Sequence, residues 1–209
     1  DYSYKHFYLD SYGKDYDILN IDTNQYNPAT STNFILTAGL LSFFQQIFSY
    51  AKNMNKAQIY NIEKPLWALV GSKVSGRGTN SDLLTMLKYF YDILNNREHL
   101  TEYIRFLFSD QFENNNKIRS KFEYLLRSYR LPNDIDNLVG DIYLSIFNGI
   151  GNLRIFQIKN SDNEIALCSG DNSFFGLIDI GDVGEFKKLA EANQLIFEEQ
   201  SFTESLFGS

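Results

Sequence analysis

The sequence has few of the residues that build metal and redox sites. Its 209 residues include one cysteine, Cys168, and two histidines, His6 and His99. A single cysteine excludes an intramolecular disulfide and a cysteine metal cluster, and two widely separated histidines argue against a zinc site. The lone thiol suits a reducing cytosol. Residues 1–5 contain neither the basic start nor the apolar run of a secretory signal, so we expect a cytoplasmic protein.

Positive charge is also scarce. The chain has 19 Lys and Arg against 26 Asp and Glu, a net charge of −7 and a pI near 4.9. This balance disfavours tight nucleic-acid binding by the surface as a whole, because phosphate backbones attract basic proteins. It leaves room for a local basic loop.

Long uninterrupted apolar runs are absent as well. Residues 24–51 carry no charge, but Asn33, Gln45 and Gln46 interrupt them. A membrane span needs about 20 predominantly apolar residues. We therefore expect a buried helix of a soluble protein here and no membrane partner.

Apolar and aromatic residues are plentiful, at 44% and 16% of the chain, which is ample for a packed core. Spacings of three and four predict helices, whereas alternation predicts strands. The predicted helices are 33–53, 82–95, three amphipathic helices within 98–148, and 181–193. The predicted strands are 18–21, 66–70, 153–158, 164–168, 174–180 and 195–199, of which 153–158 and 164–168 form a hairpin. The fold class is therefore α/β.

A glycine-rich loop follows the predicted strand at 66–70. Gly71, Gly76 and Gly78 would allow close backbone approach, and Ser72, Ser75, Lys73 and Arg77 can hydrogen-bond phosphate oxygens. A loop between a strand and a helix lies at the edge of a sheet where α/β folds place ligands. The alternative is a solvated connection without a ligand.

No catalytic constellation is visible elsewhere. The only Gly-Lys pair, Gly13-Lys14, is followed by Asp15 instead of the Ser or Thr of a Walker A loop. Asp182 is expected to cap a helix at Gly181–Gly184, and Gly170-Asp171-Asn172 to form a turn. We interpret the acidic pairs as solvated ends of helices or strands; they are Asp15/Asp17, Asp134/Asp136 and Glu198/Glu199. We interpret His6 and His99 as structural residues. Cys168 has no histidine near it in the sequence, so we do not expect it to be a nucleophile.

Several groups of residues, in order along nearly the whole chain, resemble a known family. They are Asp1-Tyr-Ser-Tyr-Lys-His-Phe-Tyr with Tyr12-Gly-Lys-Asp-Tyr16, Lys64-Pro-Leu-Trp with Val70-Gly-Ser, Glu164-Ile-Ala-Leu with Gly170-Asp171-Asn172 and Phe175-Gly176, and Glu204-Ser-Leu-Phe207. The chain resembles the DEAD/DEAH-box helicases found as subunits of type III restriction enzymes.

The resemblance implies a superfamily 2 ATPase with two RecA-like domains around one ATP and its Mg²⁺, translocating on DNA, with restriction or mobile-element subunits as further partners. The family's Walker A, Asp-Glu-x-His, Ser-Ala-Thr, Gly-Trp and arginine-finger motifs are not present in this sequence, which also begins without methionine. We therefore expect a middle fragment that is inactive and binds no ATP alone. Phosphoryl transfer needs a phosphate cradle, metal ligands and charge stabilisers together.

The resemblance also suggests a division of the chain. Residues 1–58 would be a linker and long helix, 59–97 the first strand, turn and helix of the second RecA-like domain, 98–150 a helical insertion, and 151–209 the rest of that domain. Residues 66–72 match a motif that usually touches the nucleic-acid backbone. Gly71 and Ser72 fit it, and Lys73 and Arg77 are added from their charge.

A second function class remains open, in which the helices at 98–148 dock a protein partner without catalysis. Exposed apolar residues on those helices would favour this interaction module, whereas a basic groove beside residues 71–78 would favour the motor. An unrelated small-molecule enzyme is disfavoured by the absence of a catalytic constellation.

Overall fold

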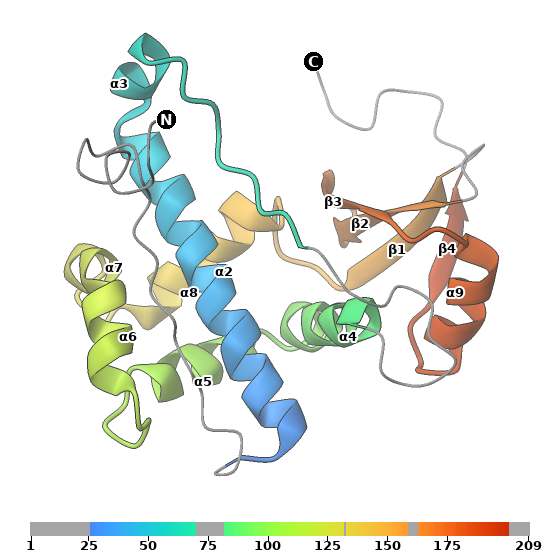
Figure 1. The fold of residues 1–209 in the computed structure, drawn as a ribbon, viewed down its shortest axis with the longest axis horizontal. Helices are drawn as coiled ribbons and strands as arrows, with labels where there is room; N and C mark the ends of the chain where they lie inside the picture. Colours follow the sequence, from blue (N-terminus) through green and yellow to red (C-terminus); the bar gives the residue numbers. More distant parts are fainter. Residues whose placement is uncertain (1–25, 70–81, 132, 159–162, 201–209) are drawn as a thin grey trace, which may run out of the picture.

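The computed structural model describes residues 26–69, 82–131, 133–158 and 163–200. A group of helices lies on one side and a four-stranded sheet on the other, with α4 between them (Figure 1). The mixed α/β class is thereby confirmed. The elements are α2 (Pro28–Lys52), α3 (Met54–Ile59), α4 (Asp82–Asn95), α5 (Arg97–Leu107), α6 (Asn115–Lys121), α7 (Glu123–Ser128), α8 (Ile135–Ile146), β1 (Leu153–Ile158), β2 (Glu164–Ser169), β3 (Phe174–Asp179), α9 (Val183–Glu191) and β4 (Phe197–Gln200).

The long helix α2 crosses the helical layer and contacts α3, α4, α5 and α8. It begins five residues earlier than predicted, because the Asn27 side chain accepts a hydrogen bond from the Thr30 backbone N–H at 2.9 Å and Pro28 follows directly. Proline is favoured at the first helical position because its missing N–H has no helical partner there. Buried Thr37 meets the hydroxyl of Tyr89 on α4 at 2.9 Å.

By length and composition alone, α2 is apolar enough to cross a membrane. In the structure one of its faces is buried against the other helices, with Phe34, Leu40, Leu41 and Phe44 each less than 5% exposed. The core helix of a soluble protein passes the same compositional test, so the prediction of a buried helix fits this packing.

The segment 98–148 is helical, as predicted, and contributes α5 to α8. The second predicted helix is divided into α6 and α7 at Phe122, whose backbone (φ −106°, ψ 21°) leaves the helical region. The hydrogen bonds from Phe122 N to Ile118 O and from Leu126 N to Phe122 O still continue across the break. The backbone hydrogen bonding therefore continues from α6 into α7, although the helix axis turns sharply at Phe122.

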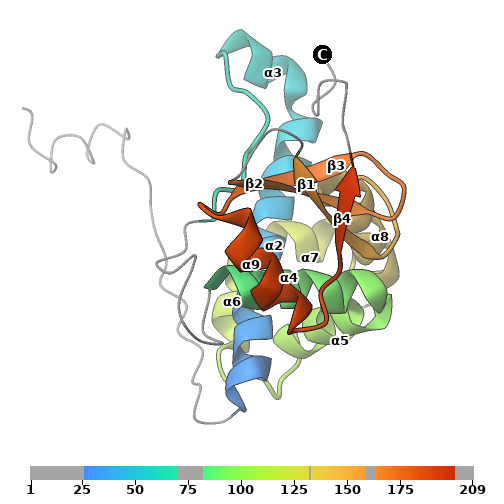
Figure 2. The same ribbon diagram turned by 90° about the vertical axis from the view of Figure 1, so that its right-hand side faces the viewer.

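The sheet has the strand order β3-β2-β1-β4 (Figure 2). The predicted hairpin is confirmed, with β1 and β2 antiparallel in the register Ile155 opposite Leu167. Strand β3 continues the antiparallel meander, and β4 pairs in parallel with β1. Helix α9 connects β3 to β4, and its start is capped as expected, since Asp182 accepts from the Glu185 backbone N–H at 2.9 Å.

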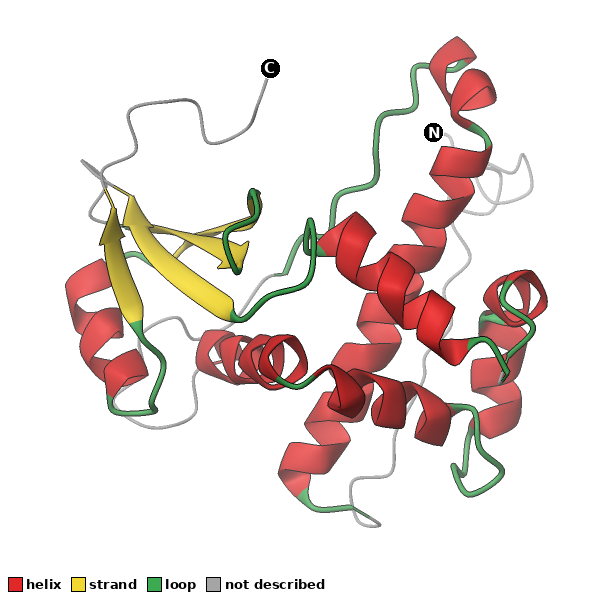
Figure 3. Ribbon diagram, turned by 180° about the vertical axis from the view of Figure 1, so that it is seen from behind, coloured by secondary structure: helices red, strands yellow, loops and turns green. Residues whose placement is uncertain are grey.

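One continuous hydrophobic core joins the helices to the sheet. Figure 3 shows the helices on one side and the strands on the other. The rings of Phe90, Phe147 and Phe175 contact one another between the helices and the sheet. The ring of Phe147 lies edge-on to Phe175 with centroids 5.0 Å apart and to Phe90 at 5.7 Å. The Phe147 side chain has no exposed surface. It therefore belongs to the core that the helices and the sheet share.

The predicted buried strand at 66–70 is wrong over its described residues. Residues 66–69 form no strand, and the Leu66 side chain is 89% exposed. The segment is held by Trp67 instead, whose ring packs against Phe43 with centroids 5.5 Å apart and lies edge-on to Phe90 at 6.5 Å. A short apolar segment can lie extended on helices and bury one large aromatic side chain there, or it can form a strand of a sheet. Its sequence pattern is the same in both cases. The predicted strand at 18–21 lies outside the described residues.

Candidate functional site

The four residues predicted to contact DNA, Gly71, Ser72, Lys73 and Arg77, lie within 70–81, outside the described residues. The structure therefore places none of them. It describes both flanks: residues up to 69 run extended beside α2, and α4 begins at Asp82. The segment before residue 70 packs on α2 through Trp67. The Trp67 ring lies so close to Gly39 of α2 that a Cβ at position 39 would be 3.3 Å from the ring. Gly39 thus permits the close approach of this segment to α2.

A polar network that the sequence did not reveal joins α4 to α5. His99 Nδ1 lies 2.6 Å from Asp92 Oδ1, and the hydroxyl of Tyr103 donates to Asp92 Oδ2 at 2.8 Å. Asn33 on α2 donates to the same hydroxyl at 2.9 Å. Burial, together with the hydrogen bond to the Asp92 carboxylate, raises the pKa of Tyr103 to about 12.

The hydrogen bonds of this network fix the tautomer of His99. Asn96 Oδ1 accepts from the Glu98 backbone N–H and caps α5, so its Nδ2 faces His99 Nε2 at 2.9 Å. Nε2 then accepts, and Nδ1 carries the proton donated to Asp92. The hydrogen bonds of this network connect α2, α4 and α5. Both ring nitrogens of His99 are engaged in them, so the imidazole has no free nitrogen to act as a base on a substrate. The structural interpretation of His99 agrees with this, although the prediction gave it no partners.

A second cluster of polar side chains surrounds Arg154 on the sheet. Arg154 of β1 lies opposite Cys168 of β2, so the two side chains are on the same face of the sheet. The Arg154 guanidinium donates to both carboxylate oxygens of Glu198, at 2.7 and 2.5 Å, and to Asp171 at 2.5 Å. These bonds from Arg154 hold the pKa of Glu198 below its usual range. The Glu198 side chain, in the short strand β4, is 38% exposed, and the bidentate pair with Arg154 is a partner that the interpretation as a solvated strand end did not include.

Cys168 belongs to the same cluster as a buried structural thiol. Burial raises the pKa of this thiol, which keeps it in the unreactive protonated form. Its Sγ donates to the carbonyl of Asn172 at 2.6 Å, within the turn predicted at 170–172. Asn172 in turn donates to Ser169 O at 2.5 Å, and Gly170 has a φ of +59°, which glycine adopts without strain.

The Arg154–Glu198 pair predicts a pH-dependent stability. The folded pKa of Glu198 is lowered, so the pair stabilises the fold above the unfolded value of about 4.3 and loses this contribution as the pH falls further. We expect Glu198→Gln to cost about 0.5–1 kcal/mol near pH 7 and to approach wild type as the pH falls below the usual glutamate range, because the lowered folded pKa of Glu198 is then being passed. Urea unfolding across this range measures the difference. Glu191→Gln, at an exposed position of α9, should show no such convergence. A Glu198→Gln effect that is constant with pH would contradict the assignment.

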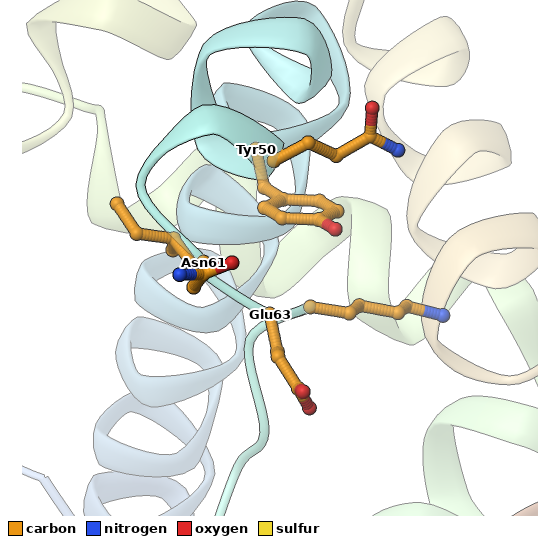
Figure 4. Close-up of a pocket in the computed structure, with 6 residues that line it drawn as sticks. Tyr50, Asn61 and Glu63 are labelled. Carbon is orange, nitrogen blue, oxygen red and sulfur yellow. The ribbon is translucent and has the colours of Figure 1, made fainter.

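The surface near the end of α2 is hollowed into an open cavity of about 420 Å³, lined by Tyr50, Gln58, Asn61, Ile62, Glu63 and Lys64. Glu63 points away from the ring of Tyr50, towards solvent (Figure 4). The lining holds no paired acid and base or nucleophile. Within the described ranges, no group of three or more His, Cys, Asp or Glu side chains is arranged to hold a metal ion.

Comparisons of the chain with known protein families, with curated proteins and with solved structures found no match.

Proposed function

We propose that this chain is part of a superfamily 2 DNA-dependent ATPase of the type III restriction kind and contributes to its second motor domain. The observation that carries the proposal is the ordered series of residue groups from Asp1 to Phe207. Two of these groups occupy structural anchor points. Trp67 binds its segment to α2 and α4, and the turn at 170–172 is held by Arg154, Ser169 and Cys168. Residues that a family resemblance marks for structure are expected at such points.

In this proposal α4, the sheet and α9 belong to a RecA-like domain, and the helices between 98 and 150 are an insertion. The parallel pairing of β4 with β1 and the crossover through α9 suit a motor domain of the α/β class. The β1-β2-β3 meander is antiparallel, and in this proposal it would be an addition to the parallel sheet of such a domain. ATP and Mg²⁺ would bind motifs outside these 209 residues, and the protein would act in the cytoplasm with restriction or mobile-element subunits.

DNA contact is assigned to Gly71, Ser72, Lys73 and Arg77. The backbone of a glycine-rich loop can approach phosphates closely, and the two cations supply charge in an otherwise acidic chain.

The interaction module receives less support from the structure. Between 98 and 148, the large apolar side chains that are exposed among the described residues are Tyr124 and Leu144. Two isolated side chains do not make the contiguous apolar patch of a protein interface.

ATP hydrolysis by the full-length protein, with and without single-stranded and duplex DNA, tests the motor. We expect DNA-stimulated turnover from the full-length protein and none from the 209-residue chain, because the chain has no phosphate cradle motif. Absence of turnover from the full-length protein would contradict the motor and leave the interaction module.

A further inference from the structure

The segment 63–69 is an extended piece of chain whose backbone has no hydrogen-bond partner. It follows α3 and runs back beside α2 (Figure 1). The Ile62 backbone N–H still donates to Ala57 O in α3, at 2.9 Å. From residue 63 to residue 69, no backbone group forms a hydrogen bond within the described part of the chain. Since backbone N–H and C=O groups are strong hydrogen-bonding groups, this segment can accept a partner along its length.

The segment also has the burial pattern of a β-strand. Pro65 and Trp67 are half-buried, whereas positions 64, 66 and 68 between and beside them are exposed. Such alternation is typical of an extended chain, whose successive side chains point to opposite sides. Trp67 fixes the inner side, because its ring packs on Phe43 of α2 and on Phe90 of α4. The segment therefore has the shape of a strand and lacks only a neighbouring strand.

Pro65 determines which edge of the segment is suited to pairing. In an extended chain, the backbone groups of every second residue point to the same edge. Proline has no N–H, so the edge of the odd-numbered residues lacks one donor. The edge of the even-numbered residues, from Lys64 to Ala68, keeps all its donors. This second edge, called the pairing edge below, can form a regular ladder with another strand.

Exposed apolar side chains are concentrated around the segment. Of the thirteen large apolar side chains that are exposed among the described residues, six lie between positions 54 and 69. They are Met54, Ile59, Tyr60, Ile62, Leu66 and Leu69. The open cavity of about 420 Å³ lies at the beginning of the segment, because residues 61–64 contribute to its lining. Exposed apolar side chains that gather in this way mark an interaction surface.

The same region is positively charged in an acidic protein. Residues 26–69 contain Lys52, Lys56 and Lys64 against one acidic residue, Glu63, so their net charge is +2 where the whole chain has −7. All four side chains are exposed, and none of them forms an ion pair in the described structure. Glu63 and Lys64 are neighbours, but successive side chains of an extended chain point to opposite sides. The lysines therefore keep their charge for an acidic partner.

We infer that the segment 63–69 binds an extended acidic peptide, which pairs with the pairing edge as an added β-strand. The backbone of the peptide supplies the hydrogen bonds that the segment lacks, and its carboxylates complement the lysines. A second copy of this chain is disfavoured, because it would bring the same positive charges to the contact. Nucleic acid has the complementary charge, but its phosphates have no donors for the carbonyl groups of the segment.

This inference goes beyond the proposed motor and does not rest on it. Peptide binding needs neither ATP nor DNA, and it is measured on the 209-residue chain. The motor is tested by ATP hydrolysis of the full-length protein. Failure of the motor and failure of this inference are therefore distinguishable.

The test measures binding of a short fluorescein-labelled peptide, in which glutamate alternates with valine, to the 209-residue chain by fluorescence anisotropy at low salt. The same peptide with lysine in place of glutamate should bind at least about tenfold more weakly. The glutamate peptide with every second backbone amide methylated should also bind at least about tenfold more weakly, because methylation removes the N–H groups that pair. Hydrogen exchange followed by mass spectrometry should show slower amide exchange at 63–69 when the glutamate peptide is bound.

Two proline substitutions distinguish the edges. Ala68→Pro removes an N–H from the pairing edge and should weaken binding about fivefold, as expected for one lost hydrogen bond. Leu69→Pro removes an N–H from the other edge and should retain most of the affinity. Neither change breaks a hydrogen bond of the described structure, and thermal unfolding shows whether each variant is folded.

A charge reversal tests the acidic character of the peptide. Lys64→Glu should weaken binding at least about fivefold, whereas Lys88→Glu, the same change at an exposed position of α4, should retain most of the affinity. Equal losses in the two charge variants or in the two proline variants, or no binding by wild type, would overturn the inference. Sedimentation that shows a wild-type dimer abolished by Ala68→Pro would also overturn it, and would assign the pairing edge to a second copy of the chain.

Discussion

Replacing Phe147 with alanine is expected to lower the free energy of unfolding by about 3–5 kcal/mol. The side chain has no exposed surface and lies at the junction of α8, α4 and the sheet, in contact with the rings of Phe90 and Phe175. Removing it leaves a cavity that the neighbouring rings fill only in part, because each is also held by other contacts. Since whole domains are stable by only about 5–15 kcal/mol, the loss is a large share of the total.

Urea denaturation followed by far-UV circular dichroism and by tryptophan fluorescence measures this effect. Leu144→Ala is the matched control, because Leu144 lies in α8 three residues before Phe147, the C-cap of that helix, and is 64% exposed. It should change stability by no more than about 0.5 kcal/mol. In wild type the two signals should give one transition, because helices and sheet share one core. Separate transitions, or a small effect of Phe147→Ala, would show that the junction does not couple them.

Helices and the hairpin were predictable because their information is local. The apolar spacing in α4, α5 and α8 and the alternation in β1 directly express which side of each element is buried. Asp182 was recognised as a cap from its place before the helix, and the structure gives it that hydrogen bond. Element ends were less accurate where a cap decides them, as at Asn27.

The error at residues 66–70 shows what local pattern does not contain. An apolar run of that length fits a buried strand and also an extended segment that inserts one ring. The difference is made by Gly39, which lies 28 positions before Trp67 and leaves room for its ring on α2. Such a fit between distant residues has no periodic signature in sequence.

Polar contacts between elements were hidden for the same reason. The partners of His99 come from the end of α4 and from the cap of α5, and Glu198 meets Arg154 only because β4 pairs with β1.

Replacing both Lys73 and Arg77 with alanine in the full-length protein is expected to weaken DNA binding about 100-fold at 0.1 M salt. Each cation that neutralises a phosphate releases bound counterions, which contributes about tenfold to affinity at this salt and about 0.9 to the slope of log K against log salt on duplex DNA. The double variant should therefore also flatten the slope by nearly two. Fluorescence anisotropy over a series of salt concentrations measures both quantities.

The matched control is Lys88→Ala/Arg105→Ala, which removes one lysine and one arginine from exposed positions of α4 and α5. If net charge alone determined affinity, the two double variants would weaken binding equally, because both lower the total charge by two. A contact by the loop at 71–77 predicts instead that only Lys73→Ala/Arg77→Ala changes the slope, since only direct phosphate contacts release counterions in fixed number. An unchanged slope would remove this loop as a DNA contact, whatever the effect on affinity.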